Sequence, residues 1–298
     1  GKSDLATDHP LRDLNTWGVG GTCSTFDAPV TAEEAYSAVA ASLKRDLPLY
    51  VLGGGSNVLV SDGQIKTAVI HTGRLDFIKI RSNADGKSAE IEAGAGVQVK
   101  KLLSIAMSEG FGGLEFLTGI PGTLGGAIWG NAGADGTGFG GLVKEASAVG
   151  RDGRAIRLAK NDFHWKYRAC PLDESLIVLV ASCVISLKME NRSDIFDRIK
   201  KYAAMKKGQP LGRKTAGCVF KNPEGTSAGL LLDRSGCKGM RVGGAVVSRS
   251  HANFIENEGN ATSRDIFELC ELCREMVYRD HGVYLEYEIK FLGSFEKD

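Results

Sequence analysis

The sequence lacks any run of about 18 consecutive apolar residues, the length that a membrane-spanning helix needs. Residues 1–13 are polar and contain no apolar signal-peptide core. The formal net charge is only +1, which gives no overall attraction to nucleic acid. These absences predict a cytoplasmic protein without a membrane span and without a nucleic-acid partner. No obligate protein partner is inferred from the sequence.

The cysteines give no sign of a disulfide framework. There are seven, an odd number scattered along a long chain, which is typical of reduced thiols in the cytoplasm. Cys270 and Cys273 have C-x-x-C spacing, but no second Cys or His pair with zinc-finger spacing follows. They fall on the apolar face of a predicted helix, so we expect core thiols and no metal site.

The composition is that of a globular protein, with 43% hydrophobic and 24% charged residues among 298. Periodicity predicts helices over 31–46, 97–109, 195–207 and 262–281. It predicts strands over 49–52, 58–60, 68–71, 77–81, 90–93, 145–149, 155–158, 176–187, 245–248, 253–256 and 284–292. Helices and strands mix without a regular βαβ repeat, which predicts an α+β fold. A composition shift at 188–194 predicts a domain boundary there.

Glycine is abundant, with 39 residues in the chain. The first cluster, Gly53-Gly54-Gly55-Ser56-Asn57, follows a predicted strand, and its amides could form a nest for a phosphate. It matches neither the Walker A motif nor the G-x-G-x-x-G dinucleotide motif. A flexible turn is therefore an equally good interpretation of this cluster.

The second cluster is Gly119-Ile120-Pro121-Gly122-Thr123-Leu124-Gly125-Gly126-Ala127, continued by Asn131-Ala132-Gly133-Ala134. Such glycine density and scarcity of charge suit a loop whose backbone packs against a large phosphate-bearing ligand. The alternative is a structural turn. Because two phosphate-type loops lie in one half of the chain, we favour the ligand-binding interpretation.

Positive charge is concentrated in residues 197–241, which contain eleven Lys and Arg but three acids. Because the whole chain is nearly neutral, this excess predicts a local positive field. Part of it fits a solvated helix face. Lys221 and Lys238 lie in glycine-rich turns, where an anion such as a diphosphate is the better interpretation.

Two carboxylates stand near the C-terminus, in Tyr284-Leu285-Glu286-Tyr287-Glu288-Ile289. Because side chains alternate along a strand, Glu286 and Glu288 should share one face, opposite Leu285, Tyr287 and Ile289. The pattern leaves two interpretations open, a solvated face or a polar site that one of the two glutamates lines.

Taken in order, these motifs resemble the UDP-N-acetylenolpyruvoylglucosamine reductase (MurB) family over about residues 15–293. The resemblance also rests on Asn15-Thr16, Gly20-Gly21, Tyr167-Arg168, Ala216-Gly217-Cys218-Val219-Phe220-Lys221-Asn222-Pro223 and Ser250-His251-Ala252-Asn253-Phe254. The short span after Arg168 resembles the shorter subtype, which lacks an extra substrate-covering loop.

The resemblance implies a two-part FAD-binding domain of the PCMH/vanillyl-alcohol-oxidase type over 1–190, split near residue 72. A C-terminal α/β substrate-binding domain over 191–298 would follow. The implied reaction is the NADPH-driven, FAD-dependent reduction of UDP-N-acetylglucosamine enolpyruvate to UDP-N-acetylmuramate, with FAD as cofactor, NADPH as hydride-donating co-substrate and the UDP-sugar as partner molecule.

The resemblance also implies site residues. Arg168 would stabilise the enolate, Cys218 would stand where the family most often has a proton-donating serine, and Glu288 would act with Arg168. Substrate contacts are implied for Tyr167, Lys207, Lys221 and Asn222. FAD contacts are implied for the two glycine clusters, at Gly53, Gly54, Gly55, Ser56, Asn57, Gly119, Ile120, Pro121, Gly122, Gly125, Gly126, Asn131, Ala132 and Gly133.

Cys218 is the chief departure from the family pattern. A thiol has a pKa of about 8.5 in model compounds, which makes it a stronger acid than an alcohol, so we expect a protonated, active donor. Two rival hypotheses stay open: another flavin oxidoreductase of the same fold, and a non-catalytic relative that binds FAD or UDP-sugar. The intact Arg168 and Glu288 weigh against the second.

Overall fold

The computed structural model describes residues 7–83, 86–166 and 169–295. Of these residues, 26–54 and 68–207 form one compact unit, which we call unit 1. Residues 7–25, 55–67 and 208–295 form the other, unit 2. Neither unit is continuous in sequence, because the chain crosses between the units three times within residues 7–70. The functional division at residue 190 stays a prediction.

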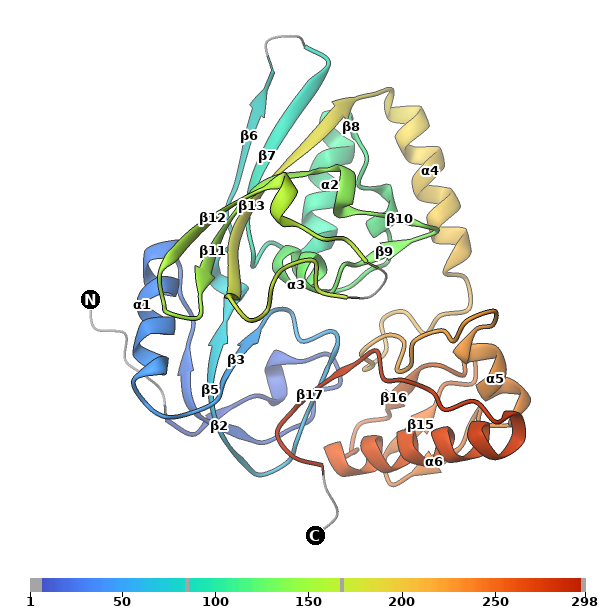
Figure 1. Ribbon diagram of the computed structural model, residues 1–298. Helices are drawn as coiled ribbons and strands as arrows, with labels where there is room; N and C mark the ends of the chain where they lie inside the picture. The colour runs from blue at the N-terminus through green and yellow to red at the C-terminus, as the bar shows by residue number, and fades with distance from the viewer. Residues whose placement is uncertain (1–6, 84–85, 167–168, 296–298) are drawn as a thin grey trace. The chain divides into compact units, whose positions relative to one another are not determined.

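Unit 1 is built on an antiparallel sheet with the strand order β12-β11-β13-β7-β6, to which β8 adds beside β13. Figure 1 shows these strands with helices α1, α2, α3 and α4 of the same unit. The elements of unit 1 are α1 (Ala32–Leu43), β3 (Leu49–Leu52), β6 (Ile78–Ser82), β7 (Ser88–Gly94), α2 (Val99–Glu109), β8 (Phe111–Gly112), η3 (Glu115–Leu117), α3 (Leu124–Trp129), β9 (Gly133–Ala134), β10 (Thr137–Gly138), β11 (Val143–Gly150), β12 (Ala155–Ala159), β13 (Ile177–Met189) and α4 (Arg192–Met205).

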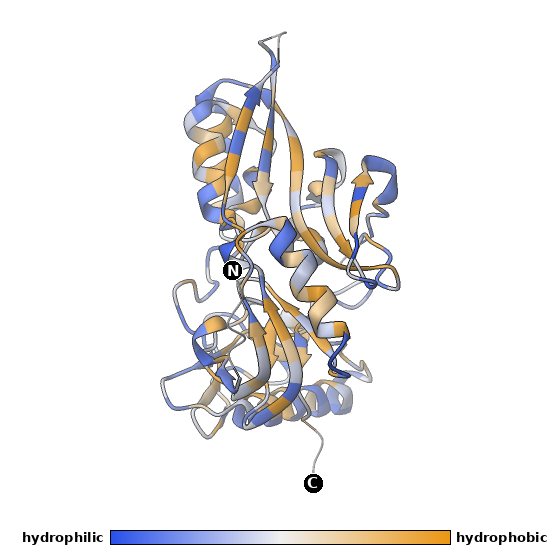
Figure 2. Cartoon of the chain, turned by 90° about the vertical axis from the view of Figure 1, so that its left-hand side faces the viewer, coloured by the Kyte–Doolittle hydropathy of each residue, from blue (hydrophilic) through white to orange (hydrophobic). Residues whose placement is uncertain are grey.

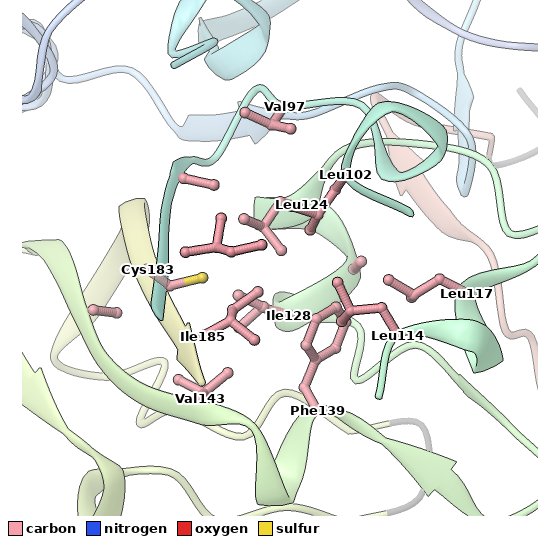
Figure 3. Close-up of a cluster of buried hydrophobic side chains, with 14 of the residues drawn as sticks. Val97, Leu102, Leu114, Leu117, Leu124, Ile128, Phe139, Val143, Cys183 and Ile185 are labelled. Carbon is pink, nitrogen blue, oxygen red and sulfur yellow. The ribbon is translucent and has the colours of Figure 1, made fainter. Parts of the chain in front are cut away.

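The core of unit 1 lies between the sheet and helices α2 and α3. Val97, Leu102, Leu124 and Ile185 belong to one buried cluster (Figure 3). In the same cluster Phe139 packs edge-on against Phe116. A second cluster joins α1 to β11 and β13. The apolar residues concentrate on the strands and on one side of the helices (Figure 2), as the sequence periodicity predicts.

Unit 2 combines short sheets with one long helix. Its elements are β1 (His9–Pro10), β2 (Thr22–Asp27), β4 (Val58–Val60), β5 (Gln64–His71), α5 (Ala228–Arg234), β14 (Arg241–Val242), β15 (Ala245–Val247), β16 (Ile255–Asn257), α6 (Ser263–His281) and β17 (Lys290–Leu292). The unit boundary falls inside β2 and inside β5. Strands β14, β15 and β16 form an antiparallel sheet, and β17 pairs in parallel with β4.

Local sequence signals explain the ends of α6. Thr262 and Asp265 exchange hydrogen bonds between side chain and backbone at its start, as in a capping box. The helix ends at Gly282, whose φ is +67°. Cys270 and Cys273 are 0% and 1% exposed on its buried face, which confirms that they are core thiols. All seven cysteines are thiols.

Two strand predictions need correction, and some elements, such as helices α3 and α5 and strand β2, were not predicted. The predicted strand over 284–292 is a strand only at β17, because residues 284–289 make a single isolated bridge, between Tyr287 and Phe220, instead of a ladder. The predicted strand at 253–256 begins at Ile255. Helix α3, inside the second glycine cluster, was not predicted, because glycine has low helix propensity.

Candidate active site

In unit 1 the two glycine clusters meet. Gly53 and Gly54 follow strand β3, and Gly122 and Thr123 precede helix α3. A Cβ atom on Gly54 would stand 2.9 Å from the Cα atom of Gly122, and a Cβ on Gly53 would stand 2.8 Å from the Thr123 Oγ1 atom. Side chains would therefore separate these backbone segments, which explains glycine at both positions.

Where the two glycine clusters meet, some polar groups lack a hydrogen-bond partner among the described residues. The Thr123 hydroxyl is buried and has no hydrogen-bond partner within the described part of the chain. The amides of Gly53 and Gly54 donate no hydrogen bond to any described backbone carbonyl. Close backbone segments with unused donors are what a diphosphate requires. These residues therefore fit the diphosphate-bearing cofactor FAD.

Other predicted FAD contacts of unit 1 have structural partners of their own. The Ile120 amide donates to the carbonyl of Leu117 at 2.9 Å, which fixes the start of the second cluster. The Asn131 side chain donates to the carbonyl of Lys166 at 2.6 Å, and its φ of +44° lies in the left-handed region. Gly133 pairs with Gly138 in the β9–β10 hairpin. Pro121, Gly125, Gly126 and Ala132 also lie in or beside this segment.

Gly55, Ser56 and Asn57, the rest of the first cluster, belong to unit 2. The carbonyl of Gly55 accepts a hydrogen bond from the Thr16 amide at 3.1 Å. The Asn57 carbonyl accepts from the Lys290 amide at 2.9 Å, and its side chain donates to the Glu288 carbonyl at 3.2 Å. Asn57 therefore holds the chain on both sides of Ile289, next to a predicted catalytic residue.

Unit 2 brings the segments of two predicted catalytic residues together. The Glu288 amide donates to the carbonyl of Val219, the residue after Cys218, at 2.8 Å. One step further, the Lys221 amide donates to the Glu286 carbonyl at 2.9 Å. The Cys218 and Glu288 side chains are both half-buried, whereas Glu286 is exposed. The burial difference favours Glu288 over Glu286 as the glutamate of the site.

Aromatic packing fixes the Glu288 segment. The ring of Tyr287 stacks on Phe220 with centroids 5.2 Å apart, and the Arg274 guanidinium lies 4.7 Å from the Tyr287 centroid. The Tyr287 hydroxyl donates to Glu271 on helix α6. Burial, followed by the neighbouring Cys270 and Glu271, raises the pKa of Tyr287, so this hydroxyl stays protonated.

Asn253 is a site residue whose role the sequence motif did not reveal. Its side-chain oxygen accepts from the Phe220 amide at 2.9 Å, and its side-chain nitrogen donates to the Phe220 carbonyl at 2.8 Å. Its own carbonyl accepts from the Val219 amide at 2.9 Å. The residue is 2% exposed. The Ser-His-Ala-Asn-Phe motif marked Asn253 in the sequence, but a single sequence does not reveal which groups the asparagine side chain binds.

The positive excess over 197–241 is largely offset in space. Lys221 forms an ion pair with Glu286 at 3.2 Å. Arg198, Lys200, Lys201, Arg213, Lys238 and Arg241 also pair with acids. Lys200 and Lys238 pair with acids of the same segment, whereas the other five cations pair with acids from other segments, which offset the excess counted from the sequence.

The remaining predicted substrate residues differ in their surroundings. The Asn222 side chain accepts a hydrogen bond at 3.1 Å from the amide of Ala228, the first residue of helix α5. Lys207 is exposed at the end of unit 1. Tyr167 and Arg168 lie outside the described residues. No group of three or more described His, Cys, Asp or Glu residues could hold a metal ion.

Comparisons with known proteins agree with these features. A family model described as "FAD binding domain" matches residues 24–159, and one described as "UDP-N-acetylenolpyruvoylglucosamine reductase, C-terminal domain" matches residues 209–292. A reductase of that name from Bradyrhizobium sp. (strain ORS 278) is 38% identical over 97% of this chain and 92% of its own length. One from Moorella thermoacetica is 37% identical over 98% and 95%.

A solved structure shows the same fold. The crystal structure of the reductase from Thermus caldophilus superposes with a TM-score of 0.83 at 33% identity, covering 97% of this chain and 99% of that one. The fold and the glycine-lined site define an FAD-binding oxidoreductase of mixed α and β structure. More specifically, the chain belongs to the UDP-N-acetylenolpyruvoylglucosamine reductase family. Among the described residues, no helix is long and apolar enough to cross a membrane.

Proposed function

We propose that this protein reduces UDP-N-acetylglucosamine enolpyruvate to UDP-N-acetylmuramate, a peptidoglycan precursor, at the expense of NADPH. When bound, FAD would supply the hydride chemistry that couples oxidation of NADPH to reduction of the enolpyruvyl double bond. The observation that carries the proposal is the backbone pairing of the Cys218 and Glu288 segments in a family member. Both residues belong to one compact unit.

The chain's own residues meet the other demands of this reaction. Hydride addition at C3 moves negative charge onto the substrate carboxylate, which needs a fixed cation, and C2 then needs a proton. We assign the cation to Arg168, whose guanidinium fork matches a carboxylate. We assign the proton to the Cys218 thiol, with Glu288 acting beside Arg168 on the enolate. Tyr167, Lys207, Lys221 and Asn222 would bind the rest of the substrate.

Two finer assignments belong to the same proposal. The substrate and NADPH are small charged molecules, which supports action in the cytoplasm without an obligate protein partner. Residues 1–190 would then bind FAD and residues 191–298 the UDP-sugar. The structure adds that segments 7–25 and 55–67 pack with residues 208–295, so the substrate-binding part would include N-terminal residues.

An anaerobic titration of the purified protein tests the proposal. NADPH should bleach the flavin absorbance, and UDP-N-acetylglucosamine enolpyruvate should restore it. Bleaching without recovery would identify a flavoprotein with another substrate or without a working proton donor. Absence of flavin, with none taken up from added FAD, would refute the proposal and leave the non-catalytic alternative.

A further inference from the structure

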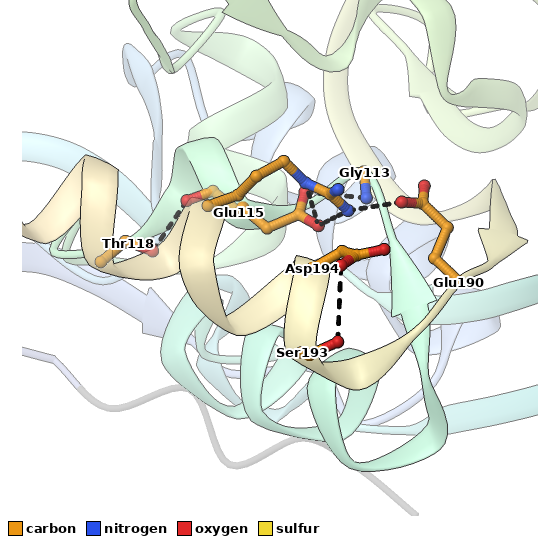
Figure 4. A network of polar contacts seen from close by, with 7 residues as sticks. Gly113, Glu115, Thr118, Glu190, Ser193 and Asp194 are labelled. Atoms are coloured by element: carbon orange, nitrogen blue, oxygen red, sulfur yellow. Dashed lines mark hydrogen bonds and ion pairs between the residues drawn. The ribbon is translucent and has the colours of Figure 1, made fainter.

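Helix α4 is tied to the segment that leads into the second glycine cluster. Arg198 donates from Nε and Nη2 to the Glu115 Oε1 atom, at 3.1 and 2.7 Å, and from Nη2 to Glu190 at 2.7 Å (Figure 4). The other Glu115 oxygen accepts from the Gly113 amide at 2.8 Å. The Glu115 side chain is 6% exposed, so its charge depends on these partners.

Glu115 begins the short helix η3, which runs directly into the glycine loop. Its carbonyl accepts from both the amide and the hydroxyl of Thr118, at 3.0 and 2.7 Å. The Ile120 amide then donates to the carbonyl of Leu117. A displacement of Glu115 would therefore be passed through these hydrogen bonds to Ile120, two residues before Gly122, which meets Gly54.

Two glycines show how tightly α4 fits this segment. A Cβ atom on Gly112 would stand 2.4 Å from the Glu190 Oε1 atom and 2.8 Å from the Arg198 Nη2 atom. A Cβ on Gly119 would stand 3.0 Å from the Cδ atom of Lys206, the residue after α4. Helix α4 and the residues that flank it thus lie close both to the start of the loop and to the residues that precede it.

We propose that Arg198 is a positioning residue for FAD binding. Its ion pairs with Glu115 and Glu190, which we call the Arg198 clamp, hold η3 so that residues 119–123 keep the conformation that receives the cofactor. This inference rests on the FAD binding of the proposed function. Arg198 itself contacts no reacting atom in this account.

The test compares the FAD dissociation constants of apoprotein variants, measured by flavin fluorescence at a temperature where each is folded. Arg198→Met should weaken FAD binding about tenfold or more, because the fork and its charge are gone. Arg198→Lys should recover only part of that loss, since one ammonium cannot reproduce the fork. Lys200→Met, on the same helix and in contact with exposed Asp197 and the ring of Phe196, is the matched control and should bind as wild type does.

A double variant separates positioning from stability. Arg198→Met leaves the buried Glu115 charge without its partner and should lower the unfolding temperature. Adding Glu115→Gln removes that charge, so thermal stability should largely return while FAD affinity stays low. Recovery of affinity together with stability would overturn the proposal, because the clamp would then be only structural.

Gly112→Ala gives an independent approach that leaves all three charged residues in place. The added methyl group should spread the clamp and weaken FAD binding in the same direction. If folded Arg198→Met protein bound FAD with wild-type affinity, the role of the clamp would be refuted but the proposed function would not. A wild-type chain that binds no FAD would refute both the clamp and the proposed function.

Discussion

The side chain of Asn253 hydrogen-bonds both backbone polar groups of Phe220, and Phe220 stands two residues after Cys218. Asparagine suits this role because one amide provides a donor and an acceptor in a fixed plane. Its carbonyl also accepts from the Val219 amide. A single buried residue therefore holds the strand-like segment that presents Cys218 and pairs with the Glu288 segment.

Asn253→Ala should lose most activity and also destabilise unit 2. The substitution leaves the buried amide and carbonyl of Phe220 without partners, at a cost of about 1–3 kcal/mol for each group. Chemical denaturation and kcat check the two effects. Asn260→Ala, an exposed residue of the same unit, is the matched control. Unchanged stability in the Asn253 variant would show that these hydrogen bonds contribute nothing.

Gly54→Ala should weaken FAD binding about tenfold or more, which corresponds to roughly 1.4 kcal/mol or more. Its methyl group would stand 2.9 Å from the Cα atom of Gly122, so one backbone segment must move. Fluorescence titration of the apoprotein measures the change. Gly141→Ala is the control, since a Cβ there has nothing within 4 Å. Equal affinities for the two variants would contradict the cofactor assignment of the glycine clusters.

The order of motifs predicted the family and fold, whereas local patterns predicted most helices and strands. The helices predicted over 31–46 and 97–109 correspond to α1, which Thr31 caps at its start, and to α2, which ends at Gly110. What the sequence could not reveal is pairing across long separations. The roles of Asn253 and Arg198 depend on partners 33 and 83 residues away. Periodicity carries no information on such contacts.

The same reason explains why a charge count within residues 197–241 misses the acids that pair with them from other segments. The count of Lys and Arg over 197–241 was correct, but ion pairs such as Lys221–Glu286 join residues 65 positions apart. The alternation at 285–289 did predict burial of Leu285 and Ile289, even though no ladder forms there. Alternate side chains can therefore be buried in the core even where the backbone forms no regular strand.

Unfolding should become easier as the pH falls, in a way that depends on His251. Burial, followed by Lys238, lowers the pKa of this imidazole, and its Nδ1 atom accepts from the Asn253 amide at 3.3 Å. The unfolded chain, with an ordinary pKa of about 6.5, binds the proton more readily. The stabilisation that the neutral His251 imidazole gives to the folded state is therefore complete above a pH of about 6.5 and is lost as the pH decreases below that value.

Urea unfolding at about pH 7.5 and about pH 5.5 measures this effect, since the unfolded His251 titrates between those values. His251→Gln should show a smaller difference between the two conditions than wild type does. His281→Gln changes an exposed histidine in the same unit and serves as the control. Identical pH dependence in all three proteins would exclude His251 as the source.

Arg168→Lys should be severely impaired in kcat, because a point charge cannot replace a guanidinium that binds a carboxylate through two hydrogen bonds. Stopped-flow kinetics separate the two half-reactions. Bleaching of the flavin by NADPH should stay near the wild-type rate, while its recovery with the enolpyruvyl substrate slows. A wild-type kcat in this variant would remove Arg168 from the mechanism.

Cys218→Ser and Cys218→Ala form a pair that isolates proton donation. Serine keeps a hydrogen that can be donated, so this variant should retain substantial activity. Alanine has none and should lose most turnover, while NADPH still bleaches the flavin because hydride transfer to FAD precedes the protonation of C2. Exchange of solvent deuterium into C2 of the product, followed by mass spectrometry, checks the proton's destination. An alanine variant that turns over as wild type does would show that another group protonates C2. The hydrogen bonds that fix Val219 and Phe220 would then serve a purpose other than presenting a donor.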